Sequence, residues 1–211
     1  MKWLRSLLFL GFYSIITSVF AAPEPQEGIQ YMRLTPPISA PVTGKIEVIE
    51  FFSYACPHCA HFAPFIENWA KKQPTSVHFT RIPVEFGRPE WGALARLYYT
   101  LQNMKLIPQY QEKVFQALHE QQVNLMAEDE MANWIQKQGI NRKKFLDIYH
   151  SFTIQSEVQR GDDLASRYSV DSVPMIFVAN QYVTAPSMAG GNEEAINTLS
   201  AMIKKAAVQR K

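Results

Sequence analysis

Cysteine is scarce in this sequence: the chain of 211 residues contains only two, Cys56 and Cys59, three positions apart. Two cysteines cannot cross-link a chain of this length, which excludes a disulfide-stapled scaffold. An excess of charge of one sign is also lacking. Once Lys2 and Arg5 are set aside, residues 22–211 contain 19 basic and 19 acidic residues, a balance that argues against nucleic-acid binding. Hydrophobic residues make up 47% and charged residues 19%, which excludes a disordered chain.

The first 21 residues have the pattern of an export signal. They contain two basic residues near the start and no acidic residue, and residues 7–20 form an apolar stretch of about 14 residues. A membrane anchor is the alternative, but a spanning helix needs roughly 20 apolar residues. Val19 and Ala21 are the small residues that signal peptidase requires before the cleaved bond. We therefore predict that residues 1–21 are removed as a signal peptide and that 22–211 is the mature protein.

The predicted mature chain is long enough for one domain with a sizeable core, which would bury roughly 70% of the surface of the unfolded chain. It contains no second long apolar segment, so we predict a soluble product. If the signal is used, that product lies outside the cytoplasm, where disulfides persist.

Strands and helices alternate along the predicted mature chain. A helix is predicted to begin beside Cys56 and to run to about Lys72, where a Gln-Pro pair ends it. Asn141 and Asn192 are predicted N-caps of two later helices. The β-branched and aromatic segments are predicted strands, namely 29–34 at an edge, 45–52, 77–84, Met175–Val178 and Tyr182–Thr184.

The segment between the third and fourth of these strands has a helical character throughout. Residues 93–138 contain no glycine and only one proline, and Met131, Trp134 and Ile135 fall on one helical face. A block of this length exceeds a single crossover helix. We therefore predict an inserted helical subdomain at about 88–168.

The chemistry is predicted to reside in Cys56-Pro57-His58-Cys59. Cys56 is expected at a helix N-terminus, where unpaired N–H groups and the helix dipole stabilise a thiolate and lower its pKa. Pro57 suits the first helical turn because it has no N–H group to lose, and a protonated His58 can stabilise the thiolate further. Cys59 lies one turn into the helix and is expected to be the more buried, resolving sulfur. Because a stabilised thiolate favours the reduced protein, the motif predicts a disulfide donor.

Two other interpretations of the cysteine pair remain open at this point. A static structural disulfide is one, although a bridge over two residues constrains the unfolded chain very little. A copper or zinc site made by Cys56, His58, Cys59 and His61 is the other, although zinc sites usually add a second, distant pair of ligands. A c-type haem is excluded, because Ala60 occupies the position that would need histidine.

The stretch EFFSYACPHC, followed about 115 residues later by SVPMIFV, resembles the DsbA family of periplasmic thiol:disulfide oxidoreductases. The resemblance covers nearly all of the predicted mature chain, and Pro64 matches the proline that kinks this helix in thioredoxins. It implies an α/β thioredoxin-like fold, in which a central mixed β-sheet is flanked by helices and carries an inserted helical subdomain. It also implies location in the periplasm of a Gram-negative bacterium.

The resemblance implies further site residues. Val173-Pro174 matches the family's cis-proline dipeptide, whose backbone would pair with an extended substrate peptide. Glu50 occupies the family's acidic position, where a buried carboxyl could exchange a proton with Cys59. The usual partner of that carboxyl is a lysine, but this sequence has Arg81, which does not release its proton and would form an ion pair instead. An exposed edge-strand glutamate is the alternative.

The function predicted in this way is that of a dithiol oxidase for protein folding. Its partners would be unfolded exported proteins with free thiols and a DsbB-type, quinone-linked reoxidant in the inner membrane. Neither an organic cofactor nor a metal is expected, and a monomer is the expected state. The alternatives are a disulfide isomerase or reductase and a periplasmic copper- or zinc-binding chaperone. The isomerase is disfavoured, because about two dozen residues before the first strong strand leave no room for a dimerisation domain.

Overall fold

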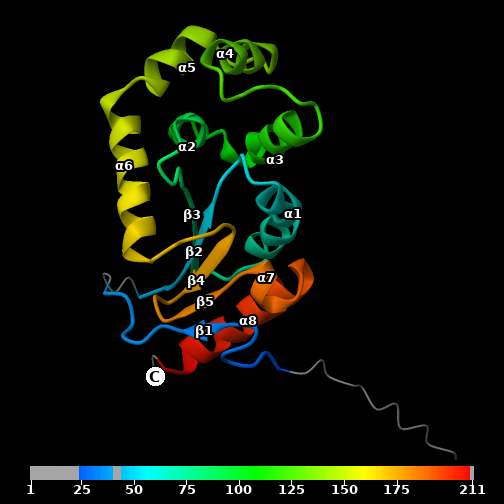
Figure 1. Cartoon of the computed structure of the whole chain (residues 1–211), viewed down its shortest axis with the longest axis vertical. Coiled ribbons are helices and arrows are strands. Elements are labelled where there is room, and N and C mark those ends of the chain that lie inside the picture. Colours follow the sequence, from blue (N-terminus) through cyan, green and yellow to red (C-terminus); the bar gives the residue numbers. More distant parts are fainter. Residues whose placement is uncertain (1–23, 40–43, 210–211) are drawn as a thin grey trace, which may run out of the picture.

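The computed structural model describes residues 24–39 and 44–209, so the predicted signal peptide lies outside the described residues. The strands form one mixed sheet in the order β1-β5-β4-β2-β3 (Figure 1). β2 and β3 are parallel, and the other neighbouring strands are antiparallel. The strands are β1 (Met32–Arg33), β2 (Ile46–Phe52), β3 (Val77–Pro83), β4 (Met175–Val178) and β5 (Tyr182–Thr184). The five predicted strands are confirmed, with β1 shorter than expected.

β2 lies between β4 and β3 in the sheet and leads into the CPHC motif. Its side chains alternate between the two faces of the sheet, as the strand period requires. Ile46 and Val48 pack with α1 (Pro57–Ala70) and α8 (Asn192–Val208), whereas Phe51 packs on the opposite side. Glu50 is in phase with Ile46 and Val48, so the alternation directs its carboxyl to the face that α1 covers.

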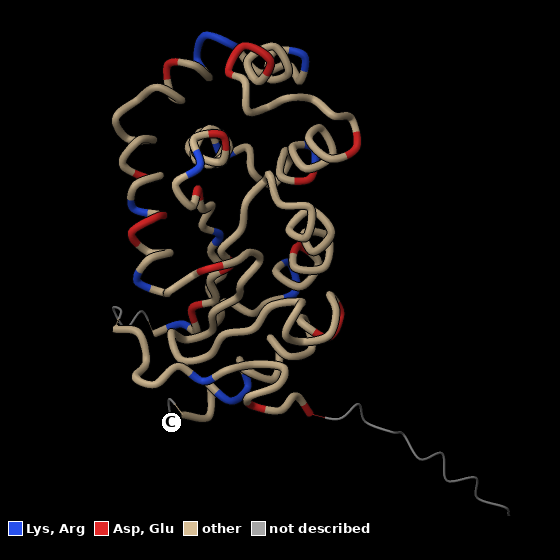
Figure 2. The backbone as a smooth tube through the Cα atoms, viewed as in Figure 1, with Lys and Arg blue, Asp and Glu red and all other residues tan. Residues whose placement is uncertain are grey.

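Five helices lie between β3 and β4, at the positions where a helical block was predicted. Figure 1 shows α3, α4 and α5 beyond one end of the sheet and α6 along its side. Basic and acidic residues are intermixed along α6, as Figure 2 shows. The five are α2 (Pro89–Asn103), α3 (Ile107–His119), α4 (Glu128–Lys137), α5 (Arg142–Tyr149) and α6 (Phe152–Arg167). Within the described part of the chain, none of the helices combines the length and apolar character needed to cross a membrane.

The two N-cap predictions have different outcomes. Asn141 caps α5, and its side chain accepts the Lys144 N–H at 2.8 Å. The prediction for Asn192 is wrong, because Gly191 is the N-cap of α8 and Asn192 is the first helical residue. The short helix α7 (Pro186–Ala189) ends at Gly190 with a positive φ of 97°. α8 follows so closely that Asn192 is already inside it, and its side-chain amide donates to the His61 carbonyl at 3.4 Å instead.

Helix α1 lies between two hydrophobic cores. Its Cys59 and Ala63 belong to the core shared with the helical block, while Phe62 and Ile66 belong to the core between the sheet and α8. Phe62 is fully buried, and burying a side chain of this size contributes roughly 1.5–3 kcal/mol. Packing on both sides therefore fixes the orientation of the helix that carries the cysteines.

Candidate active site

Cys56 is the N-cap residue of α1, and Pro57 is the first residue of the helix. The Cys56 backbone is extended (φ −88°, ψ 116°), and its carbonyl accepts the Ala60 N–H at 3.1 Å. This is the predicted placement: the sulfur lies where the first N–H groups of the helix have no intrahelical acceptor. Pro57 and His58 are exposed, whereas both cysteines are free thiols and buried.

The pKa of the Cys56 thiol is lowered to about 6. The largest cause is a hydrogen bond from the Cys59 thiol. The backbone N–H groups of Cys59 and His58 and the charge of His58 act in the same direction, while burial opposes them. The sequence predicted the contributions of the helix end and of His58, but not the larger contribution of Cys59. At neutral pH Cys56 is therefore mainly a thiolate.

Cys59 has the opposite character. Burial raises its pKa far above the ordinary value, and the hydrogen bond to Cys56 and the negative charge of Glu50 raise it further. Cys59 is 1% exposed and Cys56 is 7% exposed, which confirms that Cys59 is the more buried sulfur. The pair therefore combines an ionised outer sulfur with a protonated inner one.

Val173 lies next to Cys56 in the folded protein. Cys56 Sγ lies 3.4 Å from the Val173 carbonyl oxygen, although 117 positions separate the two residues. The sheet explains this contact, because the antiparallel pairing of β2 with β4 sets Phe51 opposite Met175. The segment that follows β2 therefore lies beside the segment that precedes β4. The Val173-Pro174 peptide bond is cis, as the resemblance implied.

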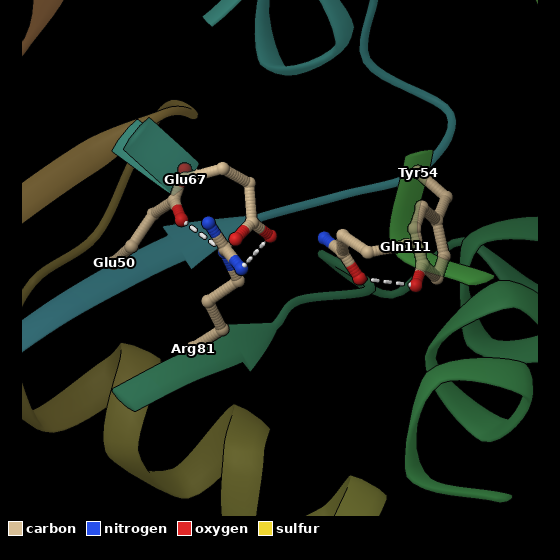
Figure 3. A network of polar contacts seen from close by, with 5 residues as sticks. All are labelled: Glu50, Tyr54, Glu67, Arg81 and Gln111. Carbon is tan, nitrogen blue, oxygen red and sulfur yellow. Dashed lines mark hydrogen bonds and ion pairs between the residues drawn. The ribbon is translucent and has the colours of Figure 1, made fainter. Parts of the chain in front are cut away.

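Glu50 is buried and paired, so the alternative of an exposed edge-strand glutamate is wrong. It is 2% exposed and lies opposite Arg81 in the β2–β3 register. Arg81 Nε donates to Glu50 Oε2 at 2.6 Å, and Arg81 Nη1 donates to Glu67 Oε1 at 2.6 Å (Figure 3). We call these three residues the Glu50–Arg81–Glu67 triad. Burial raises the pKa of Glu50, and the charge of Arg81 opposes that rise without cancelling it.

Four residues near the site were missed by the sequence analysis. The Tyr54 hydroxyl donates to Gln111 Oε1 at 2.5 Å (Figure 3), and His119 Nε2 lies 2.7 Å from the Tyr54 carbonyl. These contacts hold the segment that enters the CPHC motif. Glu67 could have been found, because it lies two helical turns after Cys59 and on the same face. Gln111 and His119 come from α3 and carry no local signal.

The family is settled by comparison with known proteins. Residues 47–202 match the model of the DSBA-like thioredoxin domain. A thiol:disulfide interchange protein DsbA from Bordetella parapertussis is 39% identical over 177 residues, covering 83% of this chain and 84% of the relative. The DsbA of Pseudomonas aeruginosa is 34% identical over 196 residues, covering 93% and 92%. This chain belongs to the DsbA family.

The DsbA fold is equally clear from solved structures. The crystal structure of Pseudomonas aeruginosa DsbA superimposes with a TM-score of 0.81 at 36% identity, covering 87% of this chain and 96% of that one. The oxidoreductase DsbA from Xylella fastidiosa gives a TM-score of 0.78 at 26% identity, covering 87% and 98%. As a DsbA-family member, the chain is a thiol:disulfide oxidoreductase with a thioredoxin-like fold. Among the described residues, no group of three or more His, Cys, Asp or Glu side chains is arranged to hold a metal ion.

Titration of the reduced protein is expected to detect the Cys56 thiolate. Its ultraviolet absorbance should fall as the pH falls through about 6. Because the folded-state pKa of Cys56 lies below the ordinary thiol value, the thiolate's contribution to stability is complete above that ordinary value and is lost as the pH falls through about 6.

Cys59→Ala removes the main hydrogen-bond donor to Cys56, so the midpoint of the Cys56 titration should rise. Cys59→Ser keeps a hydroxyl donor and is the matched control. An unchanged midpoint in Cys59→Ala would refute the role given to Cys59.

Proposed function

We propose that this DsbA-family protein is a periplasmic dithiol oxidase that donates a Cys56–Cys59 disulfide to newly exported proteins. The observation that carries the proposal is the contrast between the two sulfurs. Hydrogen bonds lower the pKa of Cys56 to about 6, while burial raises the pKa of Cys59. A thiol with a low pKa is a good leaving group, and its thiolate stabilises the reduced enzyme, so the disulfide is readily given up.

The proposed reaction has two steps. A substrate thiolate attacks the Cys56 sulfur of the oxidised enzyme, which forms a mixed disulfide and leaves Cys59 as a thiolate that takes up a proton. A second substrate thiolate then attacks the substrate sulfur of the mixed disulfide and expels Cys56 as a thiolate. The substrate loses two electrons and gains a disulfide, and the enzyme ends with Cys56 and Cys59 reduced. The catalytic residues are therefore Cys56 and Cys59.

The neighbouring residues have supporting roles in this proposal. The backbone at Val173 and Pro174 pairs with an extended substrate peptide, as an added strand would, because the Val173 carbonyl lies 3.4 Å from Cys56 Sγ. Pro57 and His58 adjust the stability of the Cys56 thiolate from the first turn of α1. Glu50 is the buried proton donor and acceptor for Cys59, supported by the effect of its charge on the Cys59 pKa.

The remaining features complete the proposal. Residues 1–21 are removed as a signal peptide, and residues 22–211 act in the periplasm as one thioredoxin-like domain with a helical insertion at about 88–168. A DsbB-type, quinone-linked protein of the inner membrane restores the disulfide. The disulfide itself is the redox group, so the reaction uses neither an organic cofactor nor a metal. The protein acts as a monomer.

The reduction potential of the Cys56–Cys59 pair tests the proposed direction of transfer. The purified mature protein would be equilibrated with glutathione buffers, and its free thiols alkylated and counted by mass spectrometry. The expected potential lies well above the glutathione couple, which is roughly −220 to −260 mV by extraction methods. A value near that of thioredoxin, roughly −270 mV, would overturn the oxidase proposal in favour of a reductase. Cys59→Ser cannot form the disulfide and gives the baseline for alkylation.

A further inference from the structure

One buried cation serves two carboxylates in the Glu50–Arg81–Glu67 triad. The side chains of Arg81 and Glu50 are 7% and 3% exposed, whereas that of Glu67 is 30% exposed. With both acids ionised, the triad carries one uncompensated negative charge beside the cysteine helix. Burying an unpaired charge is costly, so this arrangement favours the retention of one proton.

The surroundings of the two acids decide which one holds that proton. Glu67 lines a cavity of about 580 Å³ between α1 and α3, whose wall also includes Lys71 and Gln111. Solvent in this cavity can stabilise an ionised Glu67. Glu50 is not among the residues that line the cavity, and its pKa is raised by burial and further by the negative charge of Glu67. Of the two acids, Glu50 is therefore the one that retains a proton to the higher pH.

We infer that Glu67 is a positioning residue for disulfide exchange: by sharing Arg81, it raises the protonated fraction of Glu50, which is the form that can supply a proton to Cys59. The inference rests on the proposed oxidase function and deepens it. It also resolves a difficulty with arginine at position 81. An arginine that paired with Glu50 alone would hold the Glu50 carboxyl in an ion pair. In this structure Arg81 Nη1 donates to Glu67, and Glu50 is bound by Arg81 Nε. A third nitrogen, Arg81 Nη2, is buried without a partner among the described residues.

Attack of the substrate thiolate on Cys56 breaks the Cys56–Cys59 bond and leaves Cys59 as a thiolate. Glu50 transfers its proton to this thiolate, which gives a Cys59 thiol and a Glu50 carboxylate. Protonation of Cys59 prevents it from attacking the mixed disulfide in reverse. A Glu50 that is already ionised has no proton to give, so the substrate is more often expelled unchanged.

Other groups near the triad do not replace Glu67 in this role. The pKa values of Tyr54 and Tyr98 are raised by burial, so both phenols stay neutral in the working pH range. The groups that face the triad are Cys59 from α1, Tyr98 from α2 and Tyr54 from the segment after β2. Among the described residues, Glu67 is the second carboxylate that accepts a hydrogen bond from Arg81, through Nη1 where Glu50 binds Nε.

Glu67→Gln is the direct test, because glutamine keeps an acceptor for Arg81 Nη1 and removes only the charge. Carbon-13 NMR of the glutamate carboxyls in the oxidised protein would follow Glu50 as a function of pH. We expect the Glu50 midpoint to fall by about one pH unit, a tenfold change in its ratio of protonated to ionised forms. Oxidation of a dithiol peptide at pH 7 should slow by up to about tenfold if its rate follows the protonated fraction of Glu50. Glu67→Ser also removes the charge and should give the same shift, so the result does not depend on the folding of one variant.

Three controls separate positioning from a structural role. Glu112→Gln removes a charge from the same cavity, but Glu112 accepts from Gln116 and lies outside the triad, so it should change neither readout. Glu67→Asp keeps the charge and should retain most of the wild-type midpoint. In a Glu50→Gln background, Glu67→Gln should have no further effect on the rate.

Two results would overturn the inference: an unchanged Glu50 midpoint in folded Glu67→Gln, or an equal loss of rate in the Glu50→Gln background. Either result, in an enzyme with a high reduction potential that oxidises peptides, leaves the proposed function standing. If the midpoint is shifted in Glu67→Gln but the wild-type protein oxidises no peptide, the proposed function is refuted, and with it the positioning role of Glu67 in disulfide exchange.

Discussion

Serine in place of either cysteine is expected to abolish peptide oxidation, because one cysteine alone cannot form the disulfide that is donated, but only serine in place of Cys59 is expected to leave covalent partners on Cys56. Cys56 is the sulfur that stands at the helix N-terminus, beside the Val173 carbonyl. Without it, a hydroxyl with no redox chemistry faces the substrate. Without Cys59, the Cys56 thiolate can still attack a disulfide in a partner protein, which forms a mixed disulfide and expels the partner's other sulfur as a thiolate, and no Cys59 thiol is present to displace the partner from Cys56.

The two variants can be compared in one experiment. Each would be expressed from the full sequence, including the predicted export signal, alkylated in acid to prevent exchange, and separated on a non-reducing gel. Cys59→Ser should carry covalent partners that disappear on reduction, and mass spectrometry should locate the bond at Cys56. Cys56→Ser should carry far fewer. Equal amounts of adduct on both variants would mean that the outer sulfur is not the one that substrates meet.

Removal of Arg81 is expected to destabilise the fold strongly. Arg81→Met would leave the buried Glu50 and the half-buried Glu67 without their shared cation. Breaking a buried ion pair in this way costs about 3–5 kcal/mol. Without the cation, the folded-state pKa of Glu50 would rise further above its unfolded value. The loss should therefore be full at neutral pH and should shrink as the pH falls and Glu50 becomes protonated.

Urea denaturation of the oxidised protein at pH 7 and at about pH 4.5, near the ordinary glutamate pKa, measures both effects. Oxidised protein is used so that titration of the thiols does not contribute. The matched control is Arg81→Met combined with Glu50→Gln, which leaves only the half-buried Glu67 as a charge in the triad and should recover most of the lost stability. A double variant no more stable than Arg81→Met alone would show that lost packing, and not the unpaired carboxylate, causes the effect.

Strand positions and the start of α1 were predictable because they depend on local features. The predicted strands at 45–52 and 77–84 match Ile46–Phe52 and Val77–Pro83 within a residue at each end. β-branched and aromatic residues identify such segments, and turn residues bound them. Cys56-Pro57 defines a helix start equally well, since proline is favoured at the first helical position.

Contacts between distant segments were not predictable from local features. The proximity of Cys56 and Val173 depends on the pairing of β2 with β4 across the whole helical block, and only the family resemblance indicated it. The Cys59 thiol as the main hydrogen-bond donor to Cys56 requires the geometry of the first helical turn. Glu67 was overlooked because a glutamate on an amphipathic helix usually faces solvent. It belongs to the triad because its partner, Arg81, is buried.

The burial of both sulfurs bears on the working life of the enzyme. A stabilised thiolate is the form of cysteine that peroxide oxidises most readily, first to sulfenic acid and then to irreversible sulfinic acid. Cys56 presents only 7% of its surface and Cys59 only 1%, and neither is a thiolate while the disulfide is intact. Overoxidation is therefore limited mainly to the interval before the reduced cysteine pair is oxidised again. A protein that hands on oxidising equivalents is thus shielded by its own packing from the damage that such equivalents cause.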